Sequence, residues 1–279
     1  MSALITMACL KLVLRPISRV ALSTLAAISF LGLGEAIASP FLLRAIATEL
    51  NDIQERGILI VAVKDNVRPL GFRNEQNELV GFEVDIARRL AIEIFGTPEA
   101  LMLQPVSNAN RLSSLLEGDV DVVIAQLSRT DARSRLVDFS IPYYLDGVSF
   151  VTRNAQIQTL SDVSEATIAV LNDSTTIDVV RSLLPEANLV GANSYHNALM
   201  LLESNQADVF ASDASILTGW SQEYPDYRVI SPVISAEALA IAMPRGLQHD
   251  DLRQLINTAI ERWQQDGWLS ERENHWGLP

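Results

Sequence analysis

Short apolar runs alternate with helix-like segments from Ile58 onward, and this alternation constrains the fold more than any other feature of the chain. Residues 58–63 form a continuous apolar run, which is typical of a strand that is buried on both faces. The apolar side chains of residues 84–95 then fall on one helical face, and Gly96 and Pro98 follow as a stop signal. Strands that alternate with helices in this way predict an α/β fold with mainly parallel sheets.

A second helix-strand unit follows, and it recurs later in the chain. The pattern predicts a short helix over 111–116 before a buried run at 120–125, and a similar succession occupies residues 201–211. Because the matching residue types are common, chance also explains the similarity, so the recurrence only supports two lobes of similar build. The segment 250–266 has an apolar helical face and ends before Gly267, so we expect a helix there that packs on the first lobe.

Two candidate strands, 147–152 and 238–243, bracket a middle segment that has strand signals of its own at 167–171 and 207–211. We expect both strands to cross from one lobe to the other. This assignment places residues 39–146 and 238–279 in the first lobe and residues 147–237 in the second.

The amino-terminal segment predicts export. Its basic region contains Lys11, Arg15 and Arg19. The apolar run 20–33 that follows is short for a membrane span, and the small residues Ala36 and Ala38 suit a signal peptidase. We therefore expect residues 1–38 to be a signal peptide that is removed in the periplasm, with a retained membrane anchor as the alternative.

The acidic charge balance argues against a nucleic-acid partner. The chain has 21 Lys and Arg residues against 34 Asp and Glu residues, a formal net charge of −13, and loss of the basic leader would make it more acidic. The only cysteine, Cys9, lies in the leader without a preceding apolar run, which disfavours a lipoprotein. We expect a soluble, monomeric periplasmic product that has neither a thiol nor a disulfide.

Motifs for catalysis and for cofactors are not recognisable in the sequence. His196, His249 and His275 are scattered, without the paired spacing of a metal site. The chain has no G-x-S-x-G nucleophile motif, and its Gly32-x-Gly34 pair is a weak match to a phosphate loop that lies within the leader. This pattern favours binding without turnover, and with no metal or cofactor.

Residues 81–91, GFEVDIARRLA, resemble the signature of the bacterial periplasmic solute-binding proteins of family 3. The likeness extends over the chain from Gly57 and includes Asn110-Arg111, Asp138-Phe139-Ser140, Thr175-Thr176 and the segment Asp208 to Asp213. The resemblance implies a periplasmic-binding-protein-like fold of type II, with two α/β lobes joined by a two-stranded hinge. It also implies an amino-acid-binding component of an ABC transporter, with membrane permease subunits as partners. We interpret residues 81–86 as structural, because Glu83 and Asp85 suit a helix amino terminus.

The resemblance also assigns a clamp for an α-amino acid. In the family, the positions of Ser128 and Arg133 hold the ligand's α-carboxylate, as a guanidinium fork and a hydroxyl can. Asp213 matches the acceptor for the α-ammonium group, and it follows a predicted strand at 207–211. Thr175 and Thr176 precede a helix and could offer N–H groups to an anion. The alternatives are a solvated Arg133 and an ordinary helix cap at the threonines.

Ligand preference is predicted from two cations. Lys64 is the only lysine after the leader, and its position is commonly acidic in relatives that bind cationic or amide ligands. Arg111 aligns with an arginine that binds the side chain in aspartate- and glutamate-binding relatives. The resemblance therefore favours an acidic ligand, whose distal carboxylate Lys64 and Arg111 would bind together. A solvated or structurally paired Lys64 is the alternative. The sequence departs from the family at Val67, where many members have an aromatic residue that stacks over the ligand, and at Gln126, a position that is often small. We therefore expect Gln126 to narrow the pocket or to hydrogen-bond the ligand.

Two other classes of function stay open. The same fold hosts a few enzymes, such as cyclohexadienyl dehydratases, which would convert their ligand. A periplasmic sensory protein that binds a partner is the other alternative.

Overall fold

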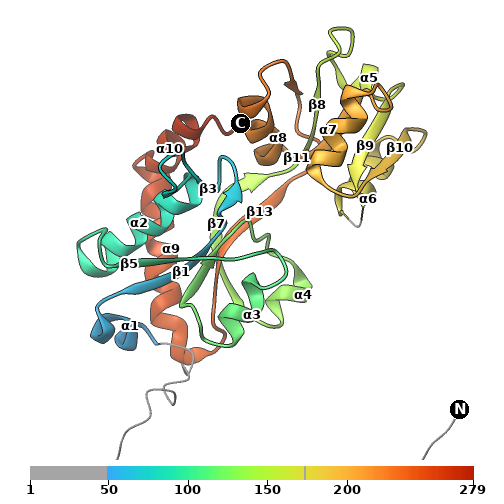
Figure 1. The fold of residues 1–279 in the computed structure, drawn as a ribbon. Coiled ribbons are helices and arrows are strands. Elements are labelled where there is room, and N and C mark those ends of the chain that lie inside the picture. Colours follow the sequence, from blue (N-terminus) through green and yellow to red (C-terminus); the bar gives the residue numbers. More distant parts are fainter. Residues whose placement is uncertain (1–48, 173) are drawn as a thin grey trace, which may run out of the picture. The chain divides into compact units, whose positions relative to one another are not determined.

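The computed structural model describes residues 49–172 and 174–279. Its strands form two five-stranded sheets and a small three-stranded sheet (Figure 1). The predicted signal peptide, residues 1–38, lies outside the described residues.

The first sheet has the strand order β5-β1-β6-β13-β7. Its strands are β1 (Leu59–Val63), β5 (Leu101–Pro105), β6 (Val122–Ile124), β7 (Asp138–Asp146) and β13 (Glu237–Met243). Strand β1 is parallel to β5 and β6, whereas β13 is antiparallel to β6 and β7. Strand β13, which comes from much later in the chain, therefore lies between β6 and β7.

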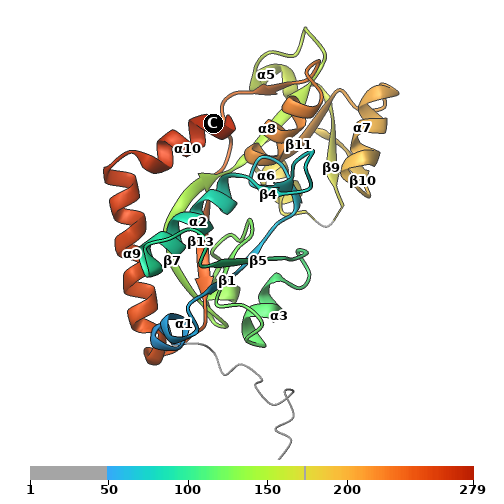
Figure 2. The same ribbon diagram turned by 60° about the vertical axis from the view of Figure 1, so that its left-hand side comes forward.

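The helices of this lobe cover both faces of its sheet. They are α1 (Leu50–Arg56), α2 (Phe82–Phe95), α3 (Arg111–Leu116), α4 (Asp131–Ser134), α9 (Asp250–Gln265) and α10 (Trp268–Trp276), with a short 3-10 helix, η1 (Leu247–His249). Side chains alternate between the faces of a strand, so Val61 packs with α2 and α9 while its neighbour Ala62 packs with α3. Figures 1 and 2 show α2 and α9 on one face of the sheet and α3 on the other.

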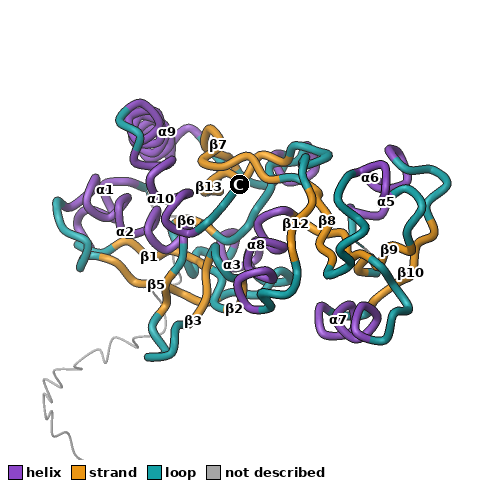
Figure 3. The backbone as a smooth tube through the Cα atoms, turned by 90° about the horizontal axis from the view of Figure 1, so that it is seen from above, coloured by secondary structure: helices purple, strands orange, loops and turns teal. Residues whose placement is uncertain are grey.

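The second sheet has the order β10-β9-β11-β8-β12. Its strands are β8 (Val148–Thr152), β9 (Thr167–Leu171), β10 (Asn188–Ala192), β11 (Val209–Asp213) and β12 (Arg228–Ile230), and its helices are α5 (Leu160–Val163), α6 (Thr176–Leu183), α7 (Tyr195–Glu203) and α8 (Ala214–Glu223). Apolar residues of α5 and α6 pack on one face, and those of α7 and α8 on the other. Figure 3 shows α6 and α7 on opposite sides of β9. This layering confirms the predicted α/β class.

The chain passes between the sheets at Gly147, after β7, and again through residues 231–236, before β13. The two connections touch, because the N–H group of Val148 donates to Ser235 Oγ (2.9 Å) and that of Ile234 donates to the Val148 carbonyl (2.7 Å). A Cβ atom at Gly147 would lie 2.0 Å from the carbonyl oxygen of Ser235, so only glycine fits there.

Several predicted elements are confirmed with small changes in their bounds. The strand predicted at 167–171 is β9, and the helix predicted at 250–266 is α9. The strand predicted at 207–211 is β11, which extends to Asp213, so this residue ends the strand rather than following it. The small sheet of β2 (Asn66–Val67), β3 (Gly71–Arg73) and β4 (Leu79–Val80) was not foreseen, because its strands are too short to show a period.

Candidate functional site

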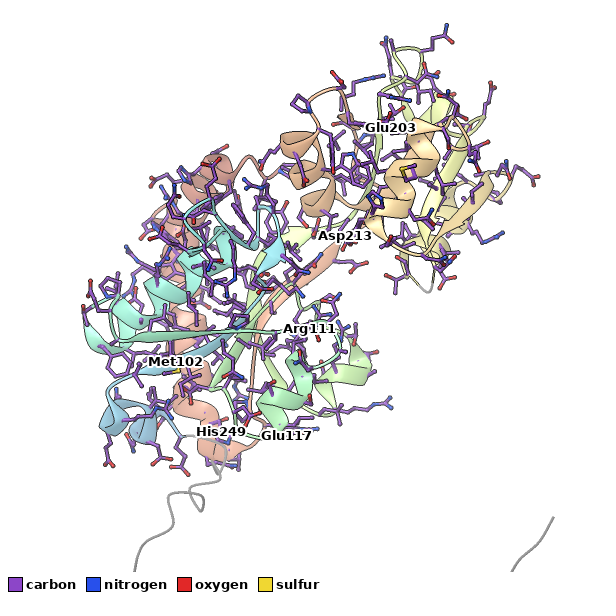
Figure 4. All side chains as sticks on the ribbon, viewed as in Figure 1. Met102, Arg111, Glu117, Glu203, Asp213 and His249 are labelled. Carbon is purple, nitrogen blue, oxygen red and sulfur yellow. The ribbon has the colours of Figure 1, made fainter. Side chains whose placement is uncertain are left out.

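A cavity of about 680 Å³ brings together residues from both sheets and their connections. The predicted site residues that line it are Arg111, Gln126, Ser128, Arg133, Thr175, Thr176 and Asp213. Figure 4 labels two of them, Arg111 at the start of α3 and Asp213 at the end of β11. Lys64 does not line the cavity.

Arg133 and Ser128 form a pair at one wall of the cavity. The Arg133 Nη1 atom donates to the Ser128 carbonyl (2.8 Å) and to Ser128 Oγ (3.0 Å). Thr130 caps α4, because its hydroxyl accepts a hydrogen bond from the Arg133 N–H group (3.3 Å). Thr130 therefore caps the helix while the guanidinium of Arg133 still lines the cavity. This half-buried cation can receive a carboxylate through its remaining N–H groups.

Arg111 is the second guanidinium of this wall, and it is 9% exposed. Its Nη1 atom donates to the carbonyls of Ala125 (2.7 Å) and Gln126 (2.6 Å). Burial, followed by the charge of Arg133, lowers the pKa of Arg111, but an arginine remains charged in proteins. The two arginines thus give the cavity a cationic wall that is fixed by backbone acceptors.

Asp213 contributes a carboxylate from the second lobe. It ends β11 and precedes α8, and its Oδ2 atom accepts a hydrogen bond from Gln126 Nε2 (3.0 Å). Burial, and then the charges of Asp146 and Glu237, raise the pKa of Asp213 to about 7. A positively charged ligand group near this carboxylate would relieve the unfavourable environment.

Gln126 joins the cationic wall to Asp213. Its backbone has φ 50°, in the left-handed region that residues other than glycine adopt rarely. Its N–H group donates to Glu83 Oε1 (2.6 Å), which lies at the start of α2. Together with the bond from Arg111 to its carbonyl, this contact holds the Gln126 backbone from both sides.

Thr175 and Thr176 lie where α6 begins. Thr175 is exposed and Thr176 is buried, and the Thr176 N–H group donates to Ser174 Oγ (3.1 Å). Both residues line the cavity together with Asn172 and Ser174. The second lobe therefore presents hydroxyl and amide groups to the same space as Asp213.

Residues 59–279 match the profile of the bacterial extracellular solute-binding proteins, family 3. The chain belongs to this family. Its curated relatives include the glutamine-binding protein of Geobacillus stearothermophilus, which is 32% identical over 212 residues, or 75% of this chain and 80% of the relative. The glutamate-binding protein GluB of Corynebacterium glutamicum is 30% identical over 224 residues, or 76% of each chain.

Enzymes also occur among the relatives of this family 3 protein. The cyclohexadienyl dehydratase of Pseudomonas aeruginosa is 26% identical over 241 residues, or 84% of this chain and 88% of the enzyme. Among solved structures, the solute receptor for L-cysteine of Neisseria gonorrhoeae has a TM-score of 0.66 at 26% identity and covers 83% of this chain and 94% of the receptor. These likenesses confirm the predicted fold, a periplasmic binding protein of type II.

Lys64 of this family 3 protein directly follows β1, lies outside the cavity lining, and is 3% exposed. Its Nζ atom donates to the Val106 carbonyl (3.1 Å). Burial, and then the charge of Arg111, lower the pKa of Lys64. The charge of Arg111 thus acts on Lys64, but Lys64 does not line the cavity.

Three acidic residues that were not predicted as site residues line the cavity or contact Gln126. Asp146 and Glu237 line the cavity, and they are paired residues at the end of β7 and the start of β13. Asp146 is saturated by the N–H groups of Gly147 (2.9 Å) and Ser215 (3.1 Å) and by the Ser215 hydroxyl. Glu83 is fully buried, and it accepts a hydrogen bond from the Tyr143 hydroxyl (2.6 Å) as well as from Gln126.

A second cavity, of about 740 Å³, lies beside the first and shares Tyr195 with it. Its lining includes the aromatic side chains of Phe72, Trp220 and Tyr224, and also Val67, the position where many relatives have an aromatic residue. This cavity is larger, and it too is lined by arginines and carboxylates. We place the candidate site in the smaller one because seven of the eight predicted site residues line it.

Within residues 49–172 and 174–279, no group of three or more His, Cys, Asp and Glu side chains is arranged to hold a metal ion. Over the same residues, no helix combines the length and the apolar character that a membrane crossing requires.

Proposed function

We propose that this protein is the amino-acid receptor of an ABC importer and that its ligand is an acidic amino acid, glutamate or aspartate. One observation carries the proposal: the cavity that Asp213 lines is also lined by Arg111 and Arg133, whose guanidinium groups are both held by backbone carbonyls. An α-amino acid carries opposite charges on adjacent groups, so this arrangement complements it.

The clamp is proposed as follows. Arg133 and Ser128 bind the α-carboxylate, Asp213 accepts the α-ammonium group, and the start of α6 at Thr175 and Thr176 completes the enclosure. Closure of the lobes about the two connections would then be driven by the ligand contacts that exist only in the closed state.

The acidic preference rests mainly on Arg111. Its Nη1 atom is engaged by two backbone carbonyls, whereas we find no hydrogen bond from its other two nitrogens to the described part of the protein. These nitrogens can donate to a distal carboxylate of the ligand. Lys64 supports the preference through its charge rather than by contact, because it lies next to Arg111 but outside the cavity lining.

The remaining parts of the proposal follow from the family and the leader. The protein is exported to the periplasm, does not convert its ligand, and delivers it to permease subunits in the membrane. A dehydratase-like activity is the alternative, because one relative carries that name.

Calorimetry of the purified protein with glutamate, aspartate, glutamine and arginine tests the proposal, followed by mass analysis of the recovered ligand. We expect glutamate or aspartate to bind at least about tenfold more tightly than glutamine and to be recovered unchanged, a difference of about 1.4 kcal/mol. Tighter binding of glutamine would overturn the acidic preference. Recovery of a converted product would favour the enzyme.

A further inference from the structure

The side chain of Gln126 forms a contact that an amino-acid ligand would need for itself. Its Nε2 atom lies 3.0 Å from Asp213 Oδ2, which is the distance expected of a hydrogen bond from a ligand ammonium group. Gln126 follows β6 in the first lobe, and Asp213 ends β11 in the second. The contact therefore joins the two lobes across the cavity.

The backbone of Gln126 is held in place independently of this contact. Glu83 accepts its N–H group (2.6 Å) and Arg111 donates to its carbonyl (2.6 Å). Both partners are buried, at 0% and 9% exposure. Two buried partners stabilise the rare φ of 50° at this residue. The amide thus starts from a fixed point two residues beyond the strand.

Asp213 needs such a donor when no ligand is bound. It is mostly buried, and the neighbouring carboxylates of Asp146 and Glu237 disfavour its charge, which the hydrogen bond from Gln126 partly offsets. An amide N–H group is a weaker partner for a carboxylate than an ammonium group, since it carries no net charge. A ligand ammonium group can therefore replace Gln126 as the partner of Asp213.

We propose that the Gln126 amide is a built-in occupant of the ammonium position at Asp213 and sets how strongly the site prefers an amino acid to the same acid without its ammonium group. The proposal rests on the proposed function, because it takes Asp213 as the ammonium acceptor. Glutamate has to displace the amide from Asp213 before its ammonium group can bind there. Glutarate, which lacks the ammonium group, leaves the contact intact.

The test compares glutamate and glutarate in the natural protein and in Gln126→Gly. Glycine tolerates the left-handed backbone and removes the amide. We expect the ratio of the glutarate Kd to the glutamate Kd to rise about tenfold in this variant, which corresponds to the loss of one hydrogen bond to a charged group. An unchanged or lower ratio would overturn the proposal.

Two further variants keep the result interpretable. Asn205→Gly is the matched control, since Asn205 also has a positive φ (55°) but is exposed and outside the cavity lining. Its ratio should equal that of the natural protein. Should Gln126→Gly fail to fold, Gln126→Asn replaces it, because asparagine tolerates the same backbone and its side chain is one methylene shorter.

A measurement without ligand separates this proposal from the proposed function. The NMR signal of the Gln126 side-chain amide, assigned by its loss in Gln126→Gly, should shift between the natural protein and Asp213→Asn. An identical signal in both proteins would refute the contact. If neither glutamate nor glutarate binds, the proposed function fails, while the NMR result still decides whether Gln126 occupies Asp213.

Discussion

The two sides of the cavity hold their charges in different ways. On the first lobe, Arg111 and Arg133 donate to backbone carbonyls, so their positions are fixed before any ligand arrives. On the second lobe, Asp213 is held by one side-chain amide and has a pKa raised to about 7. In the proposed function, this difference makes the first lobe a preorganised anchor for anions, and the second lobe the side that responds to the ligand and to pH.

Among the changes that test this comparison, replacement of Arg133 by alanine should cause the largest loss of ligand affinity. We expect Arg133→Ala to weaken glutamate binding by about 2–5 kcal/mol, because the α-carboxylate would be desolvated without its partner. Calorimetry measures the loss, and Arg135→Ala, at an exposed arginine outside the cavity lining, is the matched control. An affinity within about twofold of the natural protein would remove Arg133 from the anchor.

Replacement of Arg111 should act on selectivity. Arg111→Met removes the charge but keeps much of the volume, and we expect the preference for glutamate over glutamine to fall by about tenfold, or about 1.4 kcal/mol. The ratio of the two dissociation constants is the proper measure, because the loss of the bonds to Ala125 and Gln126 affects both ligands alike. A preserved ratio would separate Arg111 from the distal carboxylate.

Acidification should weaken only the ligand contact that the second lobe makes through Asp213. The ligand ammonium needs the charged form of Asp213, whose pKa is raised to about 7, so glutamate affinity should fall about tenfold for each pH unit below that value. Glutarate provides the control, because it makes no ammonium contact. The raised pKa also means that the stability contribution of Asp213 is greatest at low pH and is lost as the pH rises through about 7. Equal pH dependence for both ligands would contradict the assignment.

Replacement of Lys64 should have the smallest effect. The side chain is buried outside the cavity lining, and Lys64→Met should lower the ratio of glutamate to glutamine affinity by only about twofold, through the loss of a nearby charge. Competition binding measures this ratio. A tenfold loss would instead show that Lys64 reaches the ligand when the lobes close.

Much of the fold was predictable from the sequence because buried strands and amphipathic helices have clear periods. β9 and α9 were predicted almost to the residue. The lobe boundaries at 146/147 and 237/238 and the roles of the site residues stay predictions. The resemblance supplied residues that line one cavity, although they come from segments as distant as α3 and β11.

The rest of the site depends on contacts that leave no local pattern. Glu83 suits a helix start, and nothing in its surroundings along the chain indicates that its carboxylate is buried against Gln126. Asp146 and Glu237 are far apart in sequence and meet only because β7 pairs with β13. Lys64 was singled out by its rarity, which carries no information on the direction of a side chain.

Gly147 has a consequence for the movement of the lobes. The two connections are hydrogen-bonded to each other, and the space beside Gly147 is filled by the carbonyl of Ser235. We expect the two backbones, which are in direct contact, to bend together during the proposed closure of the lobes. An alanine at this position would force the two connections apart, so we expect it to change ligand affinity although Gly147 does not line the cavity.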